Sequence, residues 1–120
     1  MFTVFTVGRI IFGLYWLLAA FNHIKNHKGM TGYAASKGIP APGVSVIIST
    51  ILLIVGGLSI ITGYMVFIGL IALIVFLVGV TFTMHAFWKE SDPMTKMNSM
   101  INFQKNIALI GALLMLLAIA

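Results

Sequence analysis

Four long apolar runs decide what this chain can fold into. They cover about residues 2–21, 44–62, 65–84 and 103–120 of a 120-residue sequence. Each is about 18 to 21 residues long, and a helix of that length crosses a hydrocarbon core of roughly 30 Å. Backbone N–H and C=O groups find no water inside a bilayer, so such runs must be helical there. The sequence therefore predicts an all-α, integral membrane four-helix bundle, with residues 1–120 as a single domain.

Composition supports a membrane protein and excludes several other classes. Hydrophobic residues make up 61% of the chain and charged residues only 8%, whereas soluble domains have about 25% charged residues. Cysteine is absent, which removes disulfide chemistry, iron–sulfur ligation and covalently attached haem. The net charge is +5, but the basic residues form no continuous run. Anionic lipid head groups are therefore the expected partners, and nucleic acid is not.

The polar segment between the first two spans, residues 22–43, contains a short helix. Residues 31–37 predict an interfacial helix, and Gly38 is a favoured terminator because glycine adopts the left-handed conformation at low cost. Pro40 and Pro42 follow, and each biases its predecessor away from helix. We therefore expect an extended approach to the second span.

The polar segment before the last span, residues 85–106, holds both acidic residues of the chain. Within it, Asp92 followed by Pro93 is a helix start, because an aspartate caps free N–H groups and proline suits the first helical position. This second interfacial helix is expected to lie along the membrane surface and to pass into the fourth span. Its expected inward face consists of Met94, Met97 and Ile101.

The lysines predict the orientation of the chain. Every lysine lies in or beside the two polar segments, which four spans place on the same side of the membrane: Lys25, Lys28, Lys37, Lys89, Lys96 and Lys105. The positive-inside rule places these two loops in the cytoplasm. Both termini and the turn at residues 63–64 are then outside. We expect a multi-pass protein of a prokaryotic plasma membrane.

Every span carries one stripe of small or polar residues, which predicts where its neighbours pack, because small residues let membrane helices approach closely. The stripe of the first span comprises Arg9, Gly13, Trp16, Ala20, His23 and His27. The other stripes are Ser45, Ser49, Leu52, Gly56, Ser59 and Gly63; Gly69, Ala72, Phe76, Gly79 and Thr83; and Ala108, Gly111, Ala112, Met115 and Ala118. The tight turn at residues 63–64 also predicts that spans two and three are antiparallel neighbours.

Arg9 is a charge inside a span, about 10 Å from its start at 1.5 Å per residue. No Asp or Glu lies in any span to neutralise it. One interpretation is structural, with the side chain reaching the outer surface and pinning the bundle. The other is ligand binding. Its candidate partners are the carboxylate of Ala120, helix carbonyls, a lipid phosphate or a quinone carbonyl.

Three histidines lie at the cytoplasmic end of the spans. His23 and His27 are one helical turn apart, and His85 follows the third span. Neutral imidazoles in this arrangement could hold zinc or copper. The alternative is ordinary hydrogen bonding at the membrane interface. A b-type haem would need its two histidines inside the spans, whereas these lie near the surface.

Aromatic and polar residues at the same end predict either anchoring or a ligand site. Trp88 is typical of an aromatic anchor at the head groups. With Lys105 and Asn106 it could instead frame a quinone pocket, in which donors hold the carbonyls. The candidate ligand-binding residues are Arg9, Trp16, His23, His85, Trp88, Lys105 and Asn106. Arg9 and His23 are roughly 21 Å apart along the helix, so they cannot share one small head group.

The polar residues of the two loops also predict a cytoplasmic cap. We expect the loop 1 helix and the third loop to lie together, because their polar residues converge on one membrane face. The residues expected to tie them are His23, His85, Trp88 and Asn106.

Several segments carry a family pattern: His23 and residues 29–30, 32–42, 56–59, 85–89, 92–93 and 103–109. Together they resemble the DoxX family of small four-span membrane proteins. The family is named for a subunit of a thiosulfate:quinone oxidoreductase in sulfur-metabolising archaea, and some members are associated with redox-stress complexes. The resemblance implies an accessory or quinone-associated subunit of a membrane oxidoreductase or respiratory-type complex, without a complete active site of its own. Quinone is the implied cofactor, and the sequence has no haem or iron–sulfur motif.

The competing class is a non-redox membrane scaffold that binds a lipid or another hydrophobic molecule between its helices. Small residues on every span fit intramolecular packing, homo-oligomerisation and contacts with partner subunits equally well. A transporter is disfavoured, because four spans without inverted repeats or broken helices offer little machinery for alternating access.

Overall fold

Helices make up almost all of the described chain. The computed structural model describes residues 2–120. Its elements are α1 at Phe2–Lys25, α2 at His27–Ser36, α3 at Pro42–Thr62, α4 at Val66–Thr83, the 3-10 helix η1 at Phe87–Lys89 and α5 at Pro93–Ile119. Helices within α1, α3, α4 with its following segment, and α5 are long and apolar enough to cross a membrane. The predicted all-α, four-span architecture is therefore confirmed.

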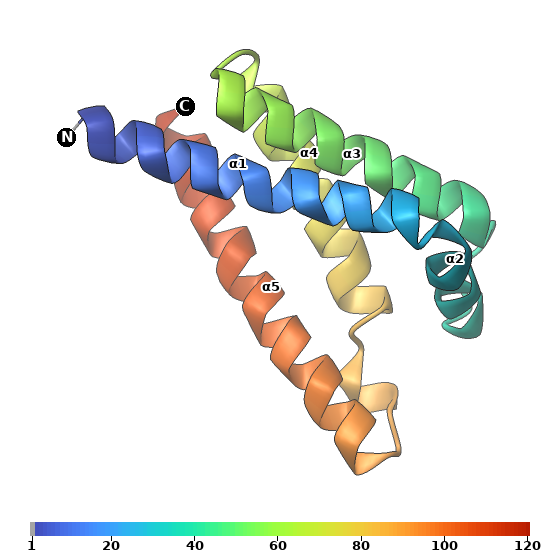
Figure 1. The fold of residues 1–120 in the computed structure, drawn as a ribbon. Coiled ribbons are helices and arrows are strands. Elements are labelled where there is room, and N and C mark those ends of the chain that lie inside the picture. The colour runs from blue at the N-terminus through green and yellow to red at the C-terminus, as the bar shows by residue number, and fades with distance from the viewer. Residues whose placement is uncertain (1) are drawn as a thin grey trace.

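The four long helices form an open row. α1 packs on α3, α3 on α4 and α4 on α5, whereas α1 and α5 share no close backbone contact within residues 2–120. Figure 1 shows that α5 ends near the beginning of α1 and that the two helices diverge toward the other end of the molecule. We call the end with α2 and the loop before α5 the loop end, and the opposite end the terminal end. The turn at residues 63–65 makes α3 and α4 antiparallel neighbours, as predicted.

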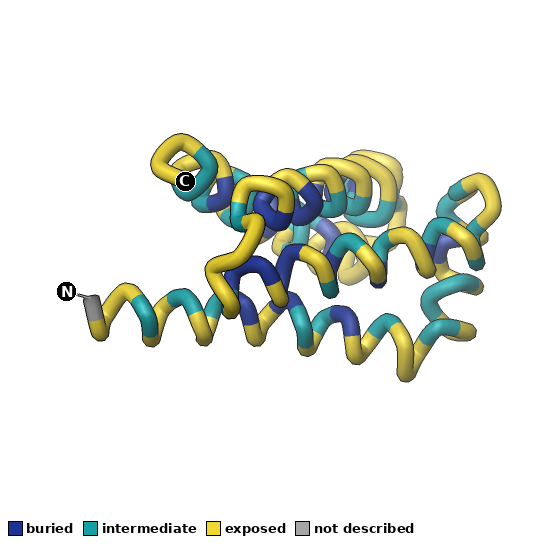
Figure 2. The backbone as a smooth tube through the Cα atoms, turned by 90° about the horizontal axis from the view of Figure 1, so that it is seen from above, coloured by how far each residue is buried: buried dark blue, intermediate teal, exposed yellow. Residues whose placement is uncertain are grey.

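The core is an apolar cluster that joins all four long helices. Leu53 of α3, Leu73 and Leu77 of α4 and Leu113 of α5 are at most 2% exposed, and Trp16 of α1 completes the cluster. Large apolar residues also cover the outer faces, as expected where lipid surrounds the helices. Figure 2 shows the buried residues on the sides where helices meet and the exposed residues on their outer sides.

Glycines set the distance between α1 and α3. A β-carbon on Gly13 would lie 3.0 Å from the Gly57 carbonyl oxygen, and one on Gly57 would lie 3.1 Å from the Gly13 carbonyl oxygen. The two backbones are thus in direct contact, which only small residues permit. Gly69 of α4 approaches Ser59 of α3 in the same way, with 2.4 Å from its β-carbon position to the Ser59 Cβ. Gly13, Ser59 and Gly69 belong to the predicted stripes, whereas Gly57 lies beside the stripe predicted for the second span.

The packing face predicted for the fourth span is wrong. Its residues Ala108, Gly111, Ala112, Met115 and Ala118 are exposed or only partly buried. The buried residues of α5 are instead Ser99, Asn106 and Leu113, one every two turns. Within the described chain α5 packs only on α4 and η1, so its buried seam is narrow and larger residues fill it.

α5 begins at Pro93, as predicted, but its first half does not turn inward. The Asp92 carboxylate caps it by accepting bonds of 2.9 Å from both the N–H and the hydroxyl of Thr95. The bond from the backbone N–H is the main reason that the pKa of Asp92 is lowered. The predicted inward face of Met94, Met97 and Ile101 is wrong, since each is at least 54% exposed. α5 is one continuous helix, so its contact with α4 decides which side is buried.

The first loop follows its prediction in part. α2 begins at His27, ahead of the expected start at residue 31, and gives way to Gly38 with a positive φ of 77°. The N–H of Gly38 and the next N–H bond to carbonyls of the last turn at 3.0 and 3.1 Å, which is the Schellman pattern. The extended approach is wrong at Ala41, whose φ is 45°. α3 begins directly at Pro42, whose fixed φ suits a first helical position.

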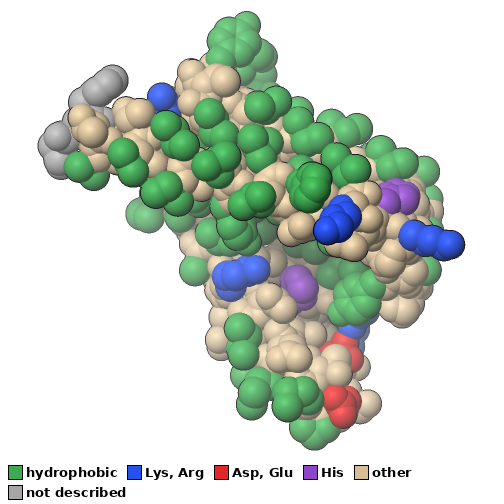
Figure 3. All heavy atoms as spheres, viewed as in Figure 1, with side chains coloured by type: hydrophobic (Ala, Val, Ile, Leu, Met, Phe, Trp, Pro, Cys, Tyr) green, Lys and Arg blue, Asp and Glu red, His purple; other side chains and the backbone are tan. Residues whose placement is uncertain are grey.

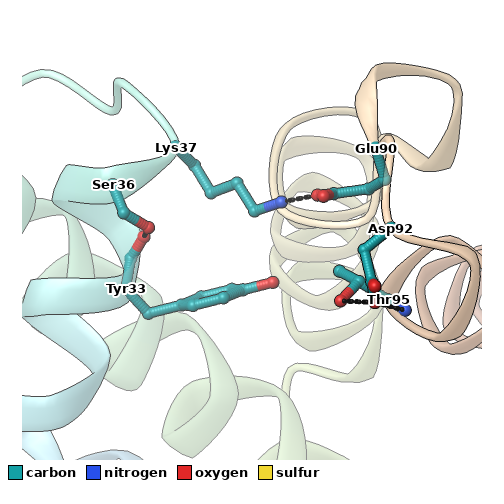
Figure 4. A network of polar contacts seen from close by, with 6 residues as sticks. All are labelled: Tyr33, Ser36, Lys37, Glu90, Asp92 and Thr95. Atoms are coloured by element: carbon teal, nitrogen blue, oxygen red, sulfur yellow. Dashed lines mark hydrogen bonds and ion pairs between the residues drawn. The ribbon is translucent and has the colours of Figure 1, made fainter.

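Charged side chains gather mainly at the loop end, as Figure 3 shows. Lys37, just after α2, donates a hydrogen bond to Glu90, between η1 and α5, and this is the one ion pair within residues 2–120. Figure 4 shows the Lys37 side chain reaching across to Glu90. That hydrogen bond is the main reason that the pKa of Lys37 is raised. The two loops therefore meet, as predicted, but through a pair that the sequence did not indicate.

The residues predicted to tie the loops do not bond to one another. No hydrogen bond in the described chain joins His23, His85, Trp88 or Asn106. Trp88 instead packs edge-on against Phe87 and Phe103, with ring centroids 5.3 and 5.6 Å apart. It is turned toward α5 because η1, on which it sits, packs on that helix.

We expect Gly57→Ala to destabilise the protein by about 1–3 kcal/mol, because a methyl group overfills the contact with Gly13. Thermal unfolding in detergent micelles measures the change. Gly111→Ala is the matched control, since nothing lies within 4 Å of a β-carbon at that position. Equal melting temperatures for the two variants would contradict the proposed backbone contact.

We expect the Lys37–Glu90 pair to stabilise the fold by about 1 kcal/mol or less. Pairing raises the pKa of Lys37 above its ordinary value of 10.5. The stabilisation is therefore complete below pH 10.5, and it is lost as the pH rises through the raised pKa. The measurement compares the melting temperatures of wild type and Glu90→Gln between pH 7 and pH 12. Lys28→Gln, at an exposed lysine, is the control. A difference that persists unchanged at the highest pH would refute the linkage.

Candidate functional site

A cavity of about 570 Å³ lies at the loop end, with walls from α1, α2, α3, α4 and α5. Small-molecule sites commonly enclose about 300–1,000 Å³. Its walls are mostly apolar and include Val46 and Leu52 of α3 and Phe76 and Val80 of α4. The space is therefore large enough for the head group and part of the tail of a hydrophobic molecule.

The cavity lies beside one side of the last turns of α4, which no helix covers, whereas α5 packs on another side at Phe82. α5 diverges from α1 toward this end (Figure 1). Gly79 and Thr83, which were predicted to pack α4 against a neighbour, are exposed and line the cavity instead. Nothing lies within 4 Å of a β-carbon on Gly79, so this position opens directly onto empty space.

Trp16 brings a buried donor to the cavity. It is 1% exposed, and its indole Nε1 has no hydrogen-bond partner. Phe12 and Tyr15 fix the ring by edge-on contacts, with centroids 5.7 and 4.9 Å away. A buried N–H without a partner costs free energy. A ligand acceptor that reached this nitrogen from the cavity would remove that cost.

Asn106 adds an amide from the opposite wall. It is 4% exposed, it lines the cavity, and no described residue bonds to its side chain. Its position on the buried seam of α5, between Ser99 and Leu113, holds it against α4. An amide offers both a donor and an acceptor, so it can bind a carbonyl or a hydroxyl.

His23 presents an imidazole of defined orientation. Its Nδ1 lies 2.8 Å from the Ala19 carbonyl oxygen, and because a carbonyl only accepts, Nδ1 carries the hydrogen. In the neutral ring Nε2 is then an acceptor. The ring also contacts Phe76, with centroids 5.9 Å apart.

Lys105 is the one Lys or Arg side chain among the described residues that line the cavity. His85 also lines it and is half-buried within electrostatic range of Lys105 and Lys37. Figure 3 shows basic and histidine side chains beside the hollow between the upper helices and α5. The nearest acid, Glu90, is already paired with Lys37. The rim is therefore suited to an electron-rich head group.

Two of the predicted site residues lie elsewhere. Arg9 lines a separate cavity at the terminal end, as its distance from His23 required. Trp88 is 50% exposed and packs outside the loop-end cavity. The structure thus brings together five of the predicted residues, namely Trp16, His23, His85, Lys105 and Asn106.

The three histidines do not form a ligand set. The Nε2 atom of His27 lies 3.4 Å from the Thr31 hydroxyl, and the residue does not line the cavity of His23 and His85. Among the described residues no group of three His, Cys, Asp or Glu side chains could hold a metal ion.

Sequence reasoning missed several lining residues. Tyr15, Ser45 and Ser49 all face the cavity, although the two serines belong to the stripe interpreted as a packing device. Ser45 donates to the Pro40 carbonyl at 2.9 Å, which shapes the start of α3. The sequence signal that could have identified the two serines was the stripe itself. Its first turn lies beyond the part of α3 that α4 covers.

Comparison with known proteins identifies the family of this chain. The DoxX family model matches residues 4–86. Inner membrane protein YphA from Escherichia coli (strain K12) is 27% identical over 110 residues, which cover 92% of this chain and 78% of that protein. No solved structure matches. Lys105 and Asn106 lie beyond the family match, whereas Trp16, His23 and His85 lie within it. Because the match spans more than half of its length, this multi-pass membrane protein belongs to the DoxX family.

Proposed function

We propose that this chain serves a membrane redox system as an accessory, quinone-associated subunit, and that the loop-end cavity holds the quinone head group. The observation that carries the proposal is the unpartnered indole N–H of Trp16 beside a mostly apolar cavity. A quinone combines a flat apolar ring with two carbonyl acceptors. Its ring can therefore pack against the apolar walls, and a carbonyl can accept the hydrogen bond that the Trp16 N–H does not make.

Different lining residues would make different hydrogen bonds to the quinone. Trp16 and Asn106 offer N–H donors from the interior, and Lys105 offers a charged donor at the rim. The free Nε2 of His23 would accept a hydrogen bond from the hydroxyl of the reduced ring. A bound quinone would supply the electron and proton transfer. The chain itself would orient the ring and exclude water, while a partner subunit would deliver or remove electrons.

The orientation belongs to the same proposal. The positive-inside rule places the lysine-bearing loop end in the cytoplasm, so the cavity would open on the cytoplasmic side of a prokaryotic plasma membrane. The exposed small-residue face of α5 is then available to a partner subunit or to a second copy of the chain.

A second candidate function is a non-redox scaffold that holds an anionic lipid in the same cavity. The charge of the rim favours it, because Lys105 and His85 have no unpaired acid beside them in the described chain. The two functions differ in whether the cavity selects a flat carbonyl-bearing ring or a charged head group.

Quinone binding is testable by fluorescence, because the chain has only two tryptophans. Trp88→Phe leaves Trp16 as the sole tryptophan. We expect a short-chain benzoquinone or naphthoquinone to quench Trp16 saturably in this background. Asn106→Leu, which removes one hydrogen bond, should weaken binding by about three- to tenfold.

Cavity-filling variants supply the control. In the Trp88→Phe background, Gly79→Leu should abolish saturable quenching by filling the cavity. Gly111→Leu, at an equally open glycine outside it, should leave quenching unchanged. Linear, unsaturable quenching in every variant would refute the quinone site. A response only to anionic lipid would favour the scaffold.

The accessory role makes a separate prediction. Gentle extraction from the native membrane followed by native mass spectrometry should yield a complex with a second protein or a quinone-sized adduct. A bare monomer or homo-oligomer that carries only phospholipid would count against a redox subunit.

A further inference from the structure

A second cavity, of about 530 Å³, lies at the terminal end around Arg9. It shares no lining residue with the loop-end cavity. Its walls come from α1, α3, α4 and α5 and are mostly apolar, with Phe5, Phe12 and Leu116 among them, and Ala120, the last residue, also lines the cavity. A strong cation therefore sits in an apolar cavity that the function proposed above does not use.

No ion pair joins Arg9 to a carboxylate in the described chain, and this includes the carboxylate of Ala120, which was one of its predicted partners. The Arg9 Nε is buried without a hydrogen-bond partner, and no described carboxylate or carbonyl bonds to its guanidinium. Its recorded contact is with the exposed Phe5 ring, whose centroid lies 5.9 Å from the guanidinium carbon. A charge at this depth is costly unless something pairs with it.

The backbone around Arg9 is shaped to leave room for the guanidinium. Gly63, which ends α3 with a φ of 73°, has its β-carbon position 2.9 Å from the Arg9 Nη1. Any side chain there would collide with the guanidinium as well as strain the backbone. On the other side, nothing lies within 4 Å of a β-carbon on Gly8, which also lines the cavity.

The location suits a ligand that arrives from the bilayer. α1 and α5 make no close backbone contact within residues 2–120, so the cavity between them can be reached from the lipid. Arg9 lies about 10 Å along α1 from its start, near the depth at which head groups meet acyl chains. The lysines all lie at the opposite end of the molecule, so Arg9 is the strong cation available there.

We propose that Arg9 and the terminal-end cavity bind the anionic head of a membrane amphiphile, a phosphate or carboxylate, whose acyl chain occupies the apolar walls. The planar guanidinium matches both anions in the same forked geometry. The apolar walls explain why a tail is required. A phospholipid and a free fatty acid share this chemistry.

The test measures lipid retention by the purified full chain in detergent, using native mass spectrometry. Phosphatidylglycerol, palmitate and phosphatidylcholine are titrated separately. We expect at least one of the two anionic amphiphiles to bind about tenfold or more tightly than phosphatidylcholine. The tighter of the two identifies the natural source as a phospholipid or a fatty acid. Equal binding of all three would overturn the proposal.

Four variants locate the site. Arg9→Gln should reduce binding of the anionic amphiphile to the phosphatidylcholine level, and Arg9→Lys should retain part of it. Gly8→Leu keeps the charge but fills the cavity, so it should also abolish the preference for the anionic amphiphile over phosphatidylcholine. This variant keeps the test decisive even if Arg9→Gln fails to fold. Gly111→Leu, outside the cavity, should bind as wild type does. Unchanged selectivity in Arg9→Lys and Gly8→Leu would overturn the proposal.

Competition with inorganic phosphate tests whether the acyl tail contributes to binding. Phosphate should not displace the bound amphiphile at equal concentration, because it cannot occupy the apolar walls. Efficient displacement would overturn the role of the cavity. Quinone quenching of Trp16 in the Gly8→Leu protein should be unaffected, so failure at one site is distinguishable from failure at the other.

Discussion

The backbone contact between Gly13 and Gly57 organises the rest of the molecule. Water does not drive membrane helices together, so close approach at small residues must supply the packing. Once α1 lies against α3 at this point, the residues one turn to either side on the same face of α1 have fixed positions. Trp16 enters the core beside Leu53, whereas Arg9 lies against the end of α3 at Gly63. Each cavity thus receives a polar residue, Trp16 or Arg9, from the same face of α1.

The second organising feature is the narrow seam between α4 and α5. Because α5 is buried only at Ser99, Asn106 and Leu113, it can lean away from α1 along its length without losing contact with α4. The divergence leaves one side of the last turns of α4 uncovered. The Lys37–Glu90 pair then joins the two separated walls across the loop end. Open space at this end is therefore a result of helix packing, and one ion pair bridges its two walls.

Local chemistry was predictable from the sequence, and long-range pairing was not. The spans, the helix start at Asp92 and the helix end at Gly38 depend on residues adjacent in the chain, as does the inward face of α1. The face of α5 depends on which helices surround it, and its small residues looked like a packing stripe although no described helix covers them. The Lys37–Glu90 contact joins residues 53 positions apart, and neither side chain carries a local signal of its partner. Five candidate site residues converged because each lines the same cavity, although Trp16, Lys105 and Asn106 lie near the middle of their helices.

Among the described residues, buried side-chain polar atoms without a partner occur at Trp16, Arg9 and Thr81, and only the first two are donors alone. Other threonines of the spans donate to carbonyls of their own helices, namely Thr50, Thr62 and Thr83. His23 also bonds to a carbonyl of its own helix, but the Trp16 and Arg9 nitrogens do not. Their partners must come from outside the helix, and the adjacent space at both sites is a cavity. The neutral indole then calls for a neutral acceptor and the guanidinium for an anion, which is why one chain would hold two chemically different ligands at its two ends.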